Sequence, residues 1–279
     1  DVTNGYIYIA GYDNVDVNNW RIEKRLASTG ALCTASACAA GDFDTDGVID
    51  GVNATEQPGD ISLDATNGYI YIVGNNSSSN WRIEKRLAST GALCTGGACA
   101  EGNFDTDGII DGIAATNFPH NISLDSTNGY IYIAGDNSSS NWRIEKRLTS
   151  TGALCTSGAC AAGDFDTDGV VDGFTDSWVA RDTDLDVTNG YIYIAGYDRT
   201  SNWRIEKRFA STGGLALANP ITGGTMDGEG VVNVVTALAV YATALDSTNG
   251  YIYVTGYSAG GDWRIEKRLA STGALCTGG

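Results

Sequence analysis

The chain has 279 residues, and 42% of them are hydrophobic, which is ordinary for a folded protein and argues against general disorder. Its formal net charge of −17 argues against nucleic acid or anionic lipid as a partner, because both would be repelled, and it favours cations instead. The longest mostly apolar stretch, residues 231–245, is too short and too polar to span a bilayer, so we expect no membrane span.

A repeat organises the chain from end to end. The pentapeptide NGYIY begins at Asn4, Asn67, Asn128, Asn189 and Asn249, so successive copies start 60 to 63 residues apart. Periods of this order are typical of propellers, solenoids and arrays. We therefore expect a single repeat domain over residues 1–279. Its units are approximately 1–60, 61–121, 122–182, 183–242 and 243–279, of which the first and last are incomplete.

Four strand-like segments make up one repeat. Residues 61–64 (ISLD) alternate apolar and polar, whereas residues 69–74 (YIYIVG) show no polar face, as expected of a strand buried on both sides. Between them, Asn67-Gly68 can take the positive φ of a hairpin turn. Residues 81–87 (WRIEKRL) alternate again, and Ile109-Ile110 begin the fourth segment. Because no segment has helical periodicity, the sequence predicts an all-β protein, a β-propeller built from five repeats of about 60 residues.

The hexapeptide WRIEKR occurs five times and contains fifteen of the seventeen Lys and Arg residues. In the second copy, alternation places Lys85 on the apolar face of the strand and Glu84 between two arginines on the other. We expect Glu84 to neutralise Arg82 and Arg86, and the stem of Lys85 to pack with apolar neighbours while its amine reaches the rim. A basic ligand-binding stripe is the alternative, but a strand repeated because blades repeat is favoured.

Three acidic loops carry the pattern D-x-D-x-D-G-x-x-D. It offers oxygen ligands at positions 1, 3, 5 and 9, a Gly at 6 for a sharp turn and a backbone carbonyl at 7, which suits Ca²⁺. Position 12 lacks the Glu of an EF-hand, and a merely solvated acidic turn is the alternative. A fourth loop around Asp227 and Glu229 lacks the first carboxylate and is doubtful. The predicted ligands are Asp42, Asp44, Asp46, Val48, Asp50, Asn103, Asp105, Asp107, Ile109, Asp111, Asp164, Asp166, Asp168, Val170 and Asp172.

Six of the seven cysteines form three C-x4-C pairs beside these loops. A zinc site needs four ligands, and the single His of the chain cannot complete three such pairs. Disulfides are therefore favoured over thiolate metal sites, which indicates a location outside a reducing cytosol. Cys276 is left alone. The predicted disulfides are Cys33–Cys38, Cys94–Cys99 and Cys155–Cys160.

The consensus LD..NGYIYIAG … W.IEKRL.STGAL resembles the bacterial propeller repeats known as SBBP and delta-60 repeats, and the resemblance covers the whole chain in five copies. It implies a propeller, usually in secreted or surface proteins of prokaryotes, and no defined chemistry. The acidic loops resemble the calcium loops of integrin α-subunit propellers (FG-GAP repeats), which carry the same run of aspartates between blade strands.

These observations favour an extracellular or cell-surface structural or adhesive protein, stabilised by calcium and disulfides. The chain holds five first halves of the repeat and four second halves, so we expect a head-to-tail homopolymer, with plain truncation of a longer chain as the rival account. A ligand- or glycan-binding secreted propeller is the alternative function. We expect no enzyme, because no catalytic set can be assembled around the single His120 and the calcium loops explain the close carboxylate clusters.

Overall fold

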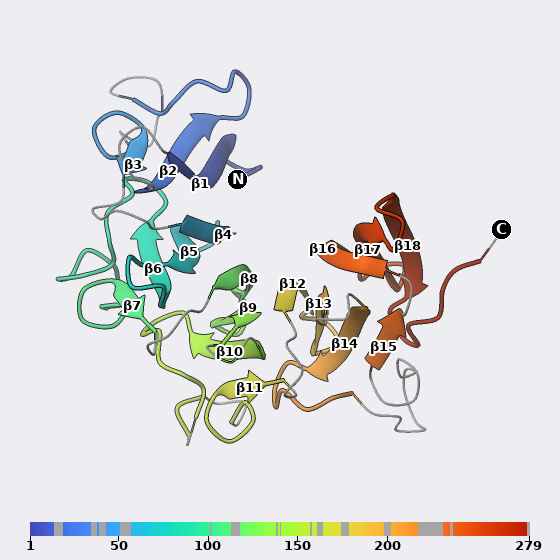
Figure 1. Cartoon of the computed structure of the whole chain (residues 1–279). Helices are drawn as coiled ribbons and strands as arrows, with labels where there is room; N and C mark the ends of the chain where they lie inside the picture. Colours follow the sequence, from blue (N-terminus) through green and yellow to red (C-terminus); the bar gives the residue numbers. More distant parts are fainter. Residues whose placement is uncertain are drawn as a thin grey trace. The chain divides into compact units, whose positions relative to one another are not determined.

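The computed structural model consists of strands, turns and loops, and the residues that it describes contain no helix (Figure 1). None of them forms a helix that could cross a membrane. The all-β prediction is confirmed for this part of the chain. The structure describes residues 1–13, 19–34, 38, 43–50, 57–100, 102–112, 118–137, 139, 141–156, 158–160, 164–173, 179–197, 202–216, 231–234 and 237–277.

The chain divides into two compact units. The first contains Asp1–Tyr130 and Leu148–Ala153, and the second contains Ile131–Arg147 and Leu154–Gly279. In the first unit a three-stranded sheet has the order β1-β2-β3 and a four-stranded sheet has the order β4-β5-β6-β7, all antiparallel. The strands are β1 (Tyr6–Asp13), β2 (Asn19–Leu26), β3 (Val48–Asp50), β4 (Gln57–Asp64), β5 (Tyr69–Asn75), β6 (Trp81–Leu87), β7 (Ile109–Asp111) and β8 (Pro119–Asp125).

The second unit repeats this arrangement. Strands β12-β13-β14-β15 form a four-stranded antiparallel sheet, and β16-β17-β18 form a three-stranded one. A further four-stranded sheet has the order β11-β10-β9-β8. The remaining strands of the chain are β9 (Tyr130–Asp136), β10 (Trp142–Leu148), β11 (Val170–Asp172), β12 (Val179–Asp186), β13 (Tyr191–Tyr197), β14 (Trp203–Phe209), β15 (Val231–Val234), β16 (Ala237–Asp246), β17 (Tyr251–Ser258) and β18 (Trp263–Leu269). The four segments predicted for one repeat are thus four neighbouring strands of one sheet.

The turn between the first two strands of a sheet depends on an aspartate. Asp64 Oδ1 accepts the backbone N–H of Asn67 (3.0 Å), and Asp64 Oδ2 accepts its side-chain amide (2.9 Å). Gly68 follows with a φ of 77°. The positive φ therefore falls on the glycine, which has no Cβ to oppose it, while Asn67 acts through its side chain.

The apolar faces of neighbouring sheets pack together to form the core of each unit. In the first unit, Trp20 and Ile22 of β2 belong to the same buried cluster as Ile70 and Ile72 of β5. Strand β5 is buried along nearly its whole length, as its lack of a polar face predicts. A repeat therefore cannot bury its apolar surface alone and depends on the next repeat for its stability.

Candidate functional site

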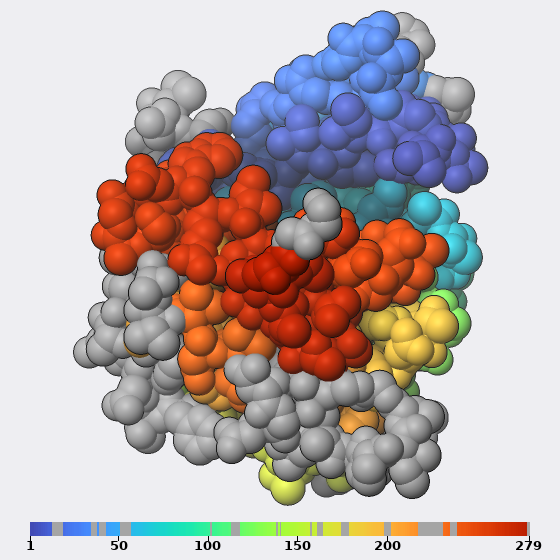
Figure 2. All heavy atoms as spheres, turned by 90° about the vertical axis from the view of Figure 1, so that its right-hand side faces the viewer, coloured from blue at the N-terminus to red at the C-terminus, as the bar shows by residue number. Residues whose placement is uncertain are grey.

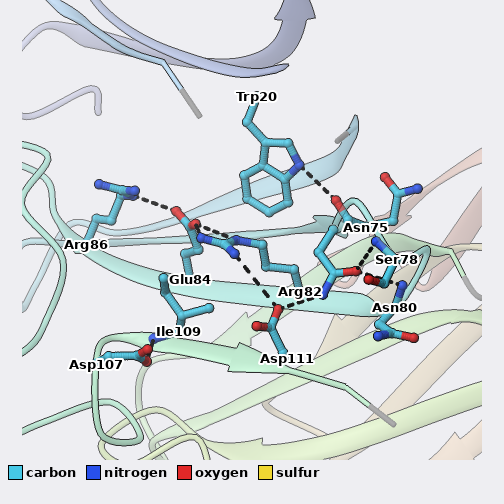
Figure 3. Close-up of polar contacts among 11 residues, drawn as sticks. Trp20, Asn75, Ser78, Asn80, Arg82, Glu84, Arg86, Asp107, Ile109 and Asp111 are labelled. Atoms are coloured by element: carbon cyan, nitrogen blue, oxygen red, sulfur yellow. Dashed lines mark hydrogen bonds and ion pairs between the residues drawn. The ribbon is translucent and has the colours of Figure 1, made fainter. Parts of the chain in front are cut away.

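The polar face of the WRIEKR strand is neutralised internally. Glu84 is buried and accepts hydrogen bonds from Nε of Arg82 and Nε of Arg86, each at 2.7 Å (Figure 3). The same pairing occurs in all five copies. The predicted pairing of the glutamate with both arginines is confirmed, so these arginines are engaged within their own strand, which disfavours a basic binding stripe.

Ion pairing also sets the ionisation of these glutamates. Burial by itself would raise the pKa of Glu145, but Arg147 and Arg143 outweigh it and hold the pKa below its ordinary value. The pKa of Glu23 is lowered as well, first of all by its hydrogen bond with Arg25. Both carboxylates are therefore charged wherever the protein is folded at neutral pH.

The amine of the WRIEKR lysine does not reach the rim, so that prediction was wrong. Lys85 is 0% exposed, and its Nζ donates to the backbone carbonyl of Thr149 at 2.9 Å, in the following repeat. The ammonium also lies 4.0 Å from the ring centroid of Tyr69 and 5.6 Å from that of Tyr71. A carbonyl dipole and two aromatic faces compensate the buried charge where water cannot.

The contact between repeats centres on one turn, the Ala-Ser-Thr or Thr-Ser-Thr tripeptide after the WRIEKR strand. In the first unit, Lys24 Nζ donates to the carbonyls of Ala88 (3.1 Å) and Ser89 (3.3 Å), and the hydroxyl of Tyr8 also donates to Ala88 (2.8 Å). In the second unit, Lys146 and Tyr132 donate to the carbonyl of Ala210 at 3.0 and 2.9 Å. In both units one repeat therefore holds the backbone of the next through a buried lysine and a tyrosine hydroxyl, and we call this arrangement the lysine contact.

Burial changes the acidity of these donors. It lowers the pKa of Lys24 and that of Lys207, since the charged ammonium loses water. Burial, together with the neighbouring Tyr6, raises the pKa of Tyr8 to about 12. The hydroxyl consequently keeps its proton throughout the neutral range and remains a donor.

The acidic loop is hydrogen-bonded to the same turn of the following repeat. Asp44, at loop position 3, has a φ of 54°, and its backbone N–H donates to the carbonyl of Thr90 (2.8 Å), the last residue of the turn that Lys24 and Tyr8 hold. Asp105 and Asp166 repeat both features, with carbonyls of Thr151 and Thr212 as acceptors at 2.9 and 2.8 Å. Aspartate tolerates this left-handed backbone better than most residues, which explains its place there.

The rest of the loop is anchored to the core of its own repeat. Phe43 is fully buried and meets the ring of Tyr8 edge-on at 6.0 Å. Gly47, at position 6, has a φ of 83°, as a sharp turn requires, and its N–H donates to Phe43 at 2.8 Å. The structure contains the three predicted disulfides next to these loops. Cys276 is exposed and free.

The predicted metal ligands at positions 3 and 5 lie on exposed loop segments. The side chain of the position-5 aspartate accepts the N–H of the position-7 residue, at 3.1 Å for Asp107 and Ile109 and for Asp168 and Val170, and at 3.0 Å for Asp46 and Val48. At position 1, Asn103 is exposed, and Asp164 accepts the N–H of Gly158 at 3.1 Å. Asp42, Asp227 and Glu229 lie outside the described residues.

The aspartate at position 9 interacts with side chains outside the acidic loop. Asp111 Oδ1 accepts the side-chain amide of Asn76 at 3.0 Å and lies 3.9 Å from Nη1 of Arg82 (Figure 3). Asp50 pairs with Arg21 at 3.4 Å and Asp172 with Arg143 at 3.5 Å. Within the described residues, no three His, Cys, Asp or Glu side chains are grouped so that they could hold a metal ion. The loops thus have the sharp turn that a Ca²⁺ loop requires, but their described aspartates do not gather around one point, and those at position 9 pair with arginines instead.

A hollow of about 650 Å³ lies in the first unit, between the first and second sheets. It contains the lysine contact, since Tyr8, Lys24 and Ala88 line it together with Asp1 and Asn4. The residues of the contact recur in the other repeats, so the hollow presents no set of polar groups peculiar to one repeat.

Two inter-repeat contacts were missed from the sequence. The first is the lysine contact, for which the signal was a lysine on the same face as Trp, Ile and Leu. The second joins inner strands: Asp60 Oδ2 accepts the N–H of Ile122 and the side-chain amide of Asn121, both at 3.0 Å. Burial raises the pKa of Asp60, and the backbone N–H groups of Ile122 and Ile61 oppose the rise. Its polar environment was not visible because its partners are 61 and 62 residues away.

No protein-family model matches the chain, and no curated protein matches it. Among solved structures, the WD40 β-propeller domain of Doa1 is similar, with a TM-score of 0.47 and 14% sequence identity over 95% of this chain and 76% of that chain.

Proposed function

We propose that this chain is a non-catalytic, extracellular architectural repeat protein, built of propeller-type blades, stabilised by disulfides and calcium, and able to join head to tail into larger assemblies. The observation that carries the proposal is the lysine contact. Polar and charged groups that recur in the repeats, the buried Lys24 and the half-buried Tyr8 in the first, bind the backbone of the next repeat. They are used for holding repeats together and not for lining a pocket of special chemistry.

The calcium part of the proposal follows from where the acidic loop lies. The N–H of Asp44 holds the carbonyl of Thr90, so a cation bound by the loop would also fix the contact with the following repeat. The sharp turn at Gly47 and the exposed aspartates support such a site. Asp50 is the residue at position 9, and its carboxylate lies 3.4 Å from Arg21. To bind the ion, this carboxylate would have to leave Arg21.

The extracellular part of the proposal is supported by the three disulfides. Each closes a short loop over a sequence separation of 5 residues, and such bonds persist in oxidising surroundings. The hollow between the first and second sheets gives little support to the alternative of a ligand- or glycan-binding protein, because it is lined by groups that the repeats share.

Thermal unfolding in calcium and in excess chelator tests the function. Calcium at ten times its Kd should add about 1.4 kcal/mol for each occupied loop, so three loops give about 4 kcal/mol. Mg²⁺ at the same concentration is the control, because it demands a strict octahedral geometry and gives up its bound water reluctantly. Equal melting temperatures in calcium and in chelator, together with binding to a panel of glycans, would instead favour the ligand-binding alternative.

A further inference from the structure

The last sheet presents an apolar face that the other sheets bury. Of the five tryptophans in WRIEKR segments, those of the first four copies are buried, whereas Trp263 on β18 is 83% exposed. Ile265 on the same strand face is 67% exposed, and its four counterparts are buried. Figure 2 shows the surface of β16–β18 in orange and red. Trp263 and Ile265, with Tyr241 and Tyr257, line a hollow of about 280 Å³ there.

Inside each unit, the strand face that carries the tryptophan packs on a glycine of the next sheet. A Cβ built on Gly74 of β5 would lie 2.6 Å from Cζ2 of Trp20, and one on Gly256 of β17 would lie 2.7 Å from Cζ2 of Trp203. Likewise, a Cβ built on Gly196 of β13 would lie 2.8 Å from Cζ2 of Trp142. The glycine is thus the seat of the indole of the preceding repeat, and a side chain there would clash with that indole and, more closely still, with a backbone carbonyl of the inner strand of its own sheet.

The flanking contacts also repeat. The indole of Trp20 donates to the carbonyl of Asn75 at 3.1 Å, and the guanidinium of Arg82 lies 5.8 Å from its ring. Arg264 lies 5.6 Å from the ring of Trp203. Apolar residues complete the seat: Ile252 and Val254 join Trp203 and Ile205 in one buried cluster.

Within the first unit, none of the described residues covers the corresponding seat on the first sheet. Gly11 of β1 occupies the position of Gly74, and a Cβ built there meets no atom within 4 Å. It shares its strand face with Ile7 and Ile9, which are 43% and 42% exposed, whereas their counterparts Ile70 and Ile72 are fully buried. The inner strand that borders Gly74 through Gln57 also has no counterpart beside β1 among the described residues.

We propose that the Trp263 face of one copy of this chain docks on the Gly11 face of a second copy. The contact reproduces the one between repeats: the indole of Trp263 packs on Gly11 of the second copy, with Ile265 against Ile7 and Ile9 of the second copy. Lys267 and Tyr253, the last donors of the lysine-contact type, then reach the carbonyl of Ala27 of the second copy. The two faces are complementary because WRIEKR already packs on YIYIAG within the chain, where Trp142 lies against Gly196 of residues 191–196.

This inference rests on the proposed head-to-tail assembly and names the surface that makes it. A head-to-tail contact of this kind is heterologous, so it does not close on itself and can continue from copy to copy. Its apolar centre, an aromatic anchor in a fitted seat with an arginine over the ring, has the composition of a binding hot spot.

Sedimentation velocity of the full chain and of single variants tests the proposal. Trp263→Ala removes the indole from a position where it contributes little to folding, since it is exposed. Gly11→Val fills the seat without a clash inside its own chain, and its φ is not in the left-handed region. Gly214→Ala is the matched control, because its Cβ makes an ordinary 3.4 Å contact with Thr212. Circular dichroism and melting curves verify that each variant folds.

The wild-type chain and Gly214→Ala should gain mass with concentration, while Trp263→Ala and Gly11→Val remain monomers. If the variants assemble as the wild type does, the proposed contact is wrong although the architectural function stands. If the wild-type chain is a monomer at every concentration, the contact is wrong as well. Protection of Trp263 from acrylamide quenching in that monomer would then assign its own first sheet as the occupant. Calcium-dependent melting tests the function separately from these outcomes.

Discussion

Replacing Lys85 with alanine removes a buried ammonium from the contact between the second and third repeats. The change eliminates the hydrogen bond to Thr149 and the contacts with two tyrosine rings, and it leaves a cavity where the fully buried stem was. A hydrogen bond to a charged group contributes about 1.5–3 kcal/mol, and truncating a long buried side chain costs about 2–5 kcal/mol. Release of the buried charge offsets part of this loss. We expect a net loss of about 3 kcal/mol, or about 6 °C or more in Tm.

The chain contains its own control. Lys267 occupies the same place in an identical hexapeptide and lies 3.6 Å from the ring of Tyr251, but no following repeat accepts from it within the described residues. Lys267→Ala should therefore cost less than about 1 kcal/mol, the contribution of an exposed cation–π contact. Urea denaturation of both variants, at concentrations where the chain is monomeric, gives the two free energies of unfolding. Equal losses would refute the reasoning, because the contact with the next repeat would then contribute nothing.

Three further predictions concern the disulfides, the acidic pH range and the acidic loops. Reduction of the three disulfides should lower the free energy of unfolding by about 2 kcal/mol for each bond, as measured by unfolding with and without reductant, and intact-mass analysis before reduction should show three pairs of missing hydrogens. The lowered pKa of Glu145 contributes stability above the unfolded value of 4.5, and this stability is lost as the pH falls through the lower folded pKa. The pH-dependence of Tm below about pH 4.5 should therefore be weaker in Glu145→Gln, and an unchanged acid profile would contradict the ion pairing. Asp105→Asn should reduce the calcium-dependent gain in Tm by about one third if three equivalent loops bind the ion, whereas Asp136→Asn, outside the loops, should leave the gain unchanged.

The strand pattern and the charge pairing of WRIEKR could be predicted from the sequence because both are local. Alternation with a period of two places Glu84 beside Arg82 and Arg86 on one strand face, whatever the rest of the fold does. The disulfides were predictable for the same reason, since each joins cysteines 5 residues apart. Information within one strand or one loop was sufficient for these features.

The partner of the lysine could not be predicted, because it lies 64 residues away in the following repeat. Amphipathic lysines usually direct the amine to water. The sequence around Lys85 does not show that a backbone carbonyl of another repeat lies within reach of its amine. The position-9 aspartates are a similar case. Asp111 lies directly opposite Arg82 in the register of β6 and β7, and this register is set by the sheet and not by the loop motif. A ligand pattern read along the loop alone could not show the competing arginine.

Electron microscopy of the purified chain in calcium tests the central claim most directly. The account predicts linear assemblies of repeating subunits for the wild-type chain, and dispersed particles for Trp263→Ala prepared in the same way. Dispersed single particles of the wild-type chain at every concentration, with or without calcium, would contradict a protein that builds structures from its own copies.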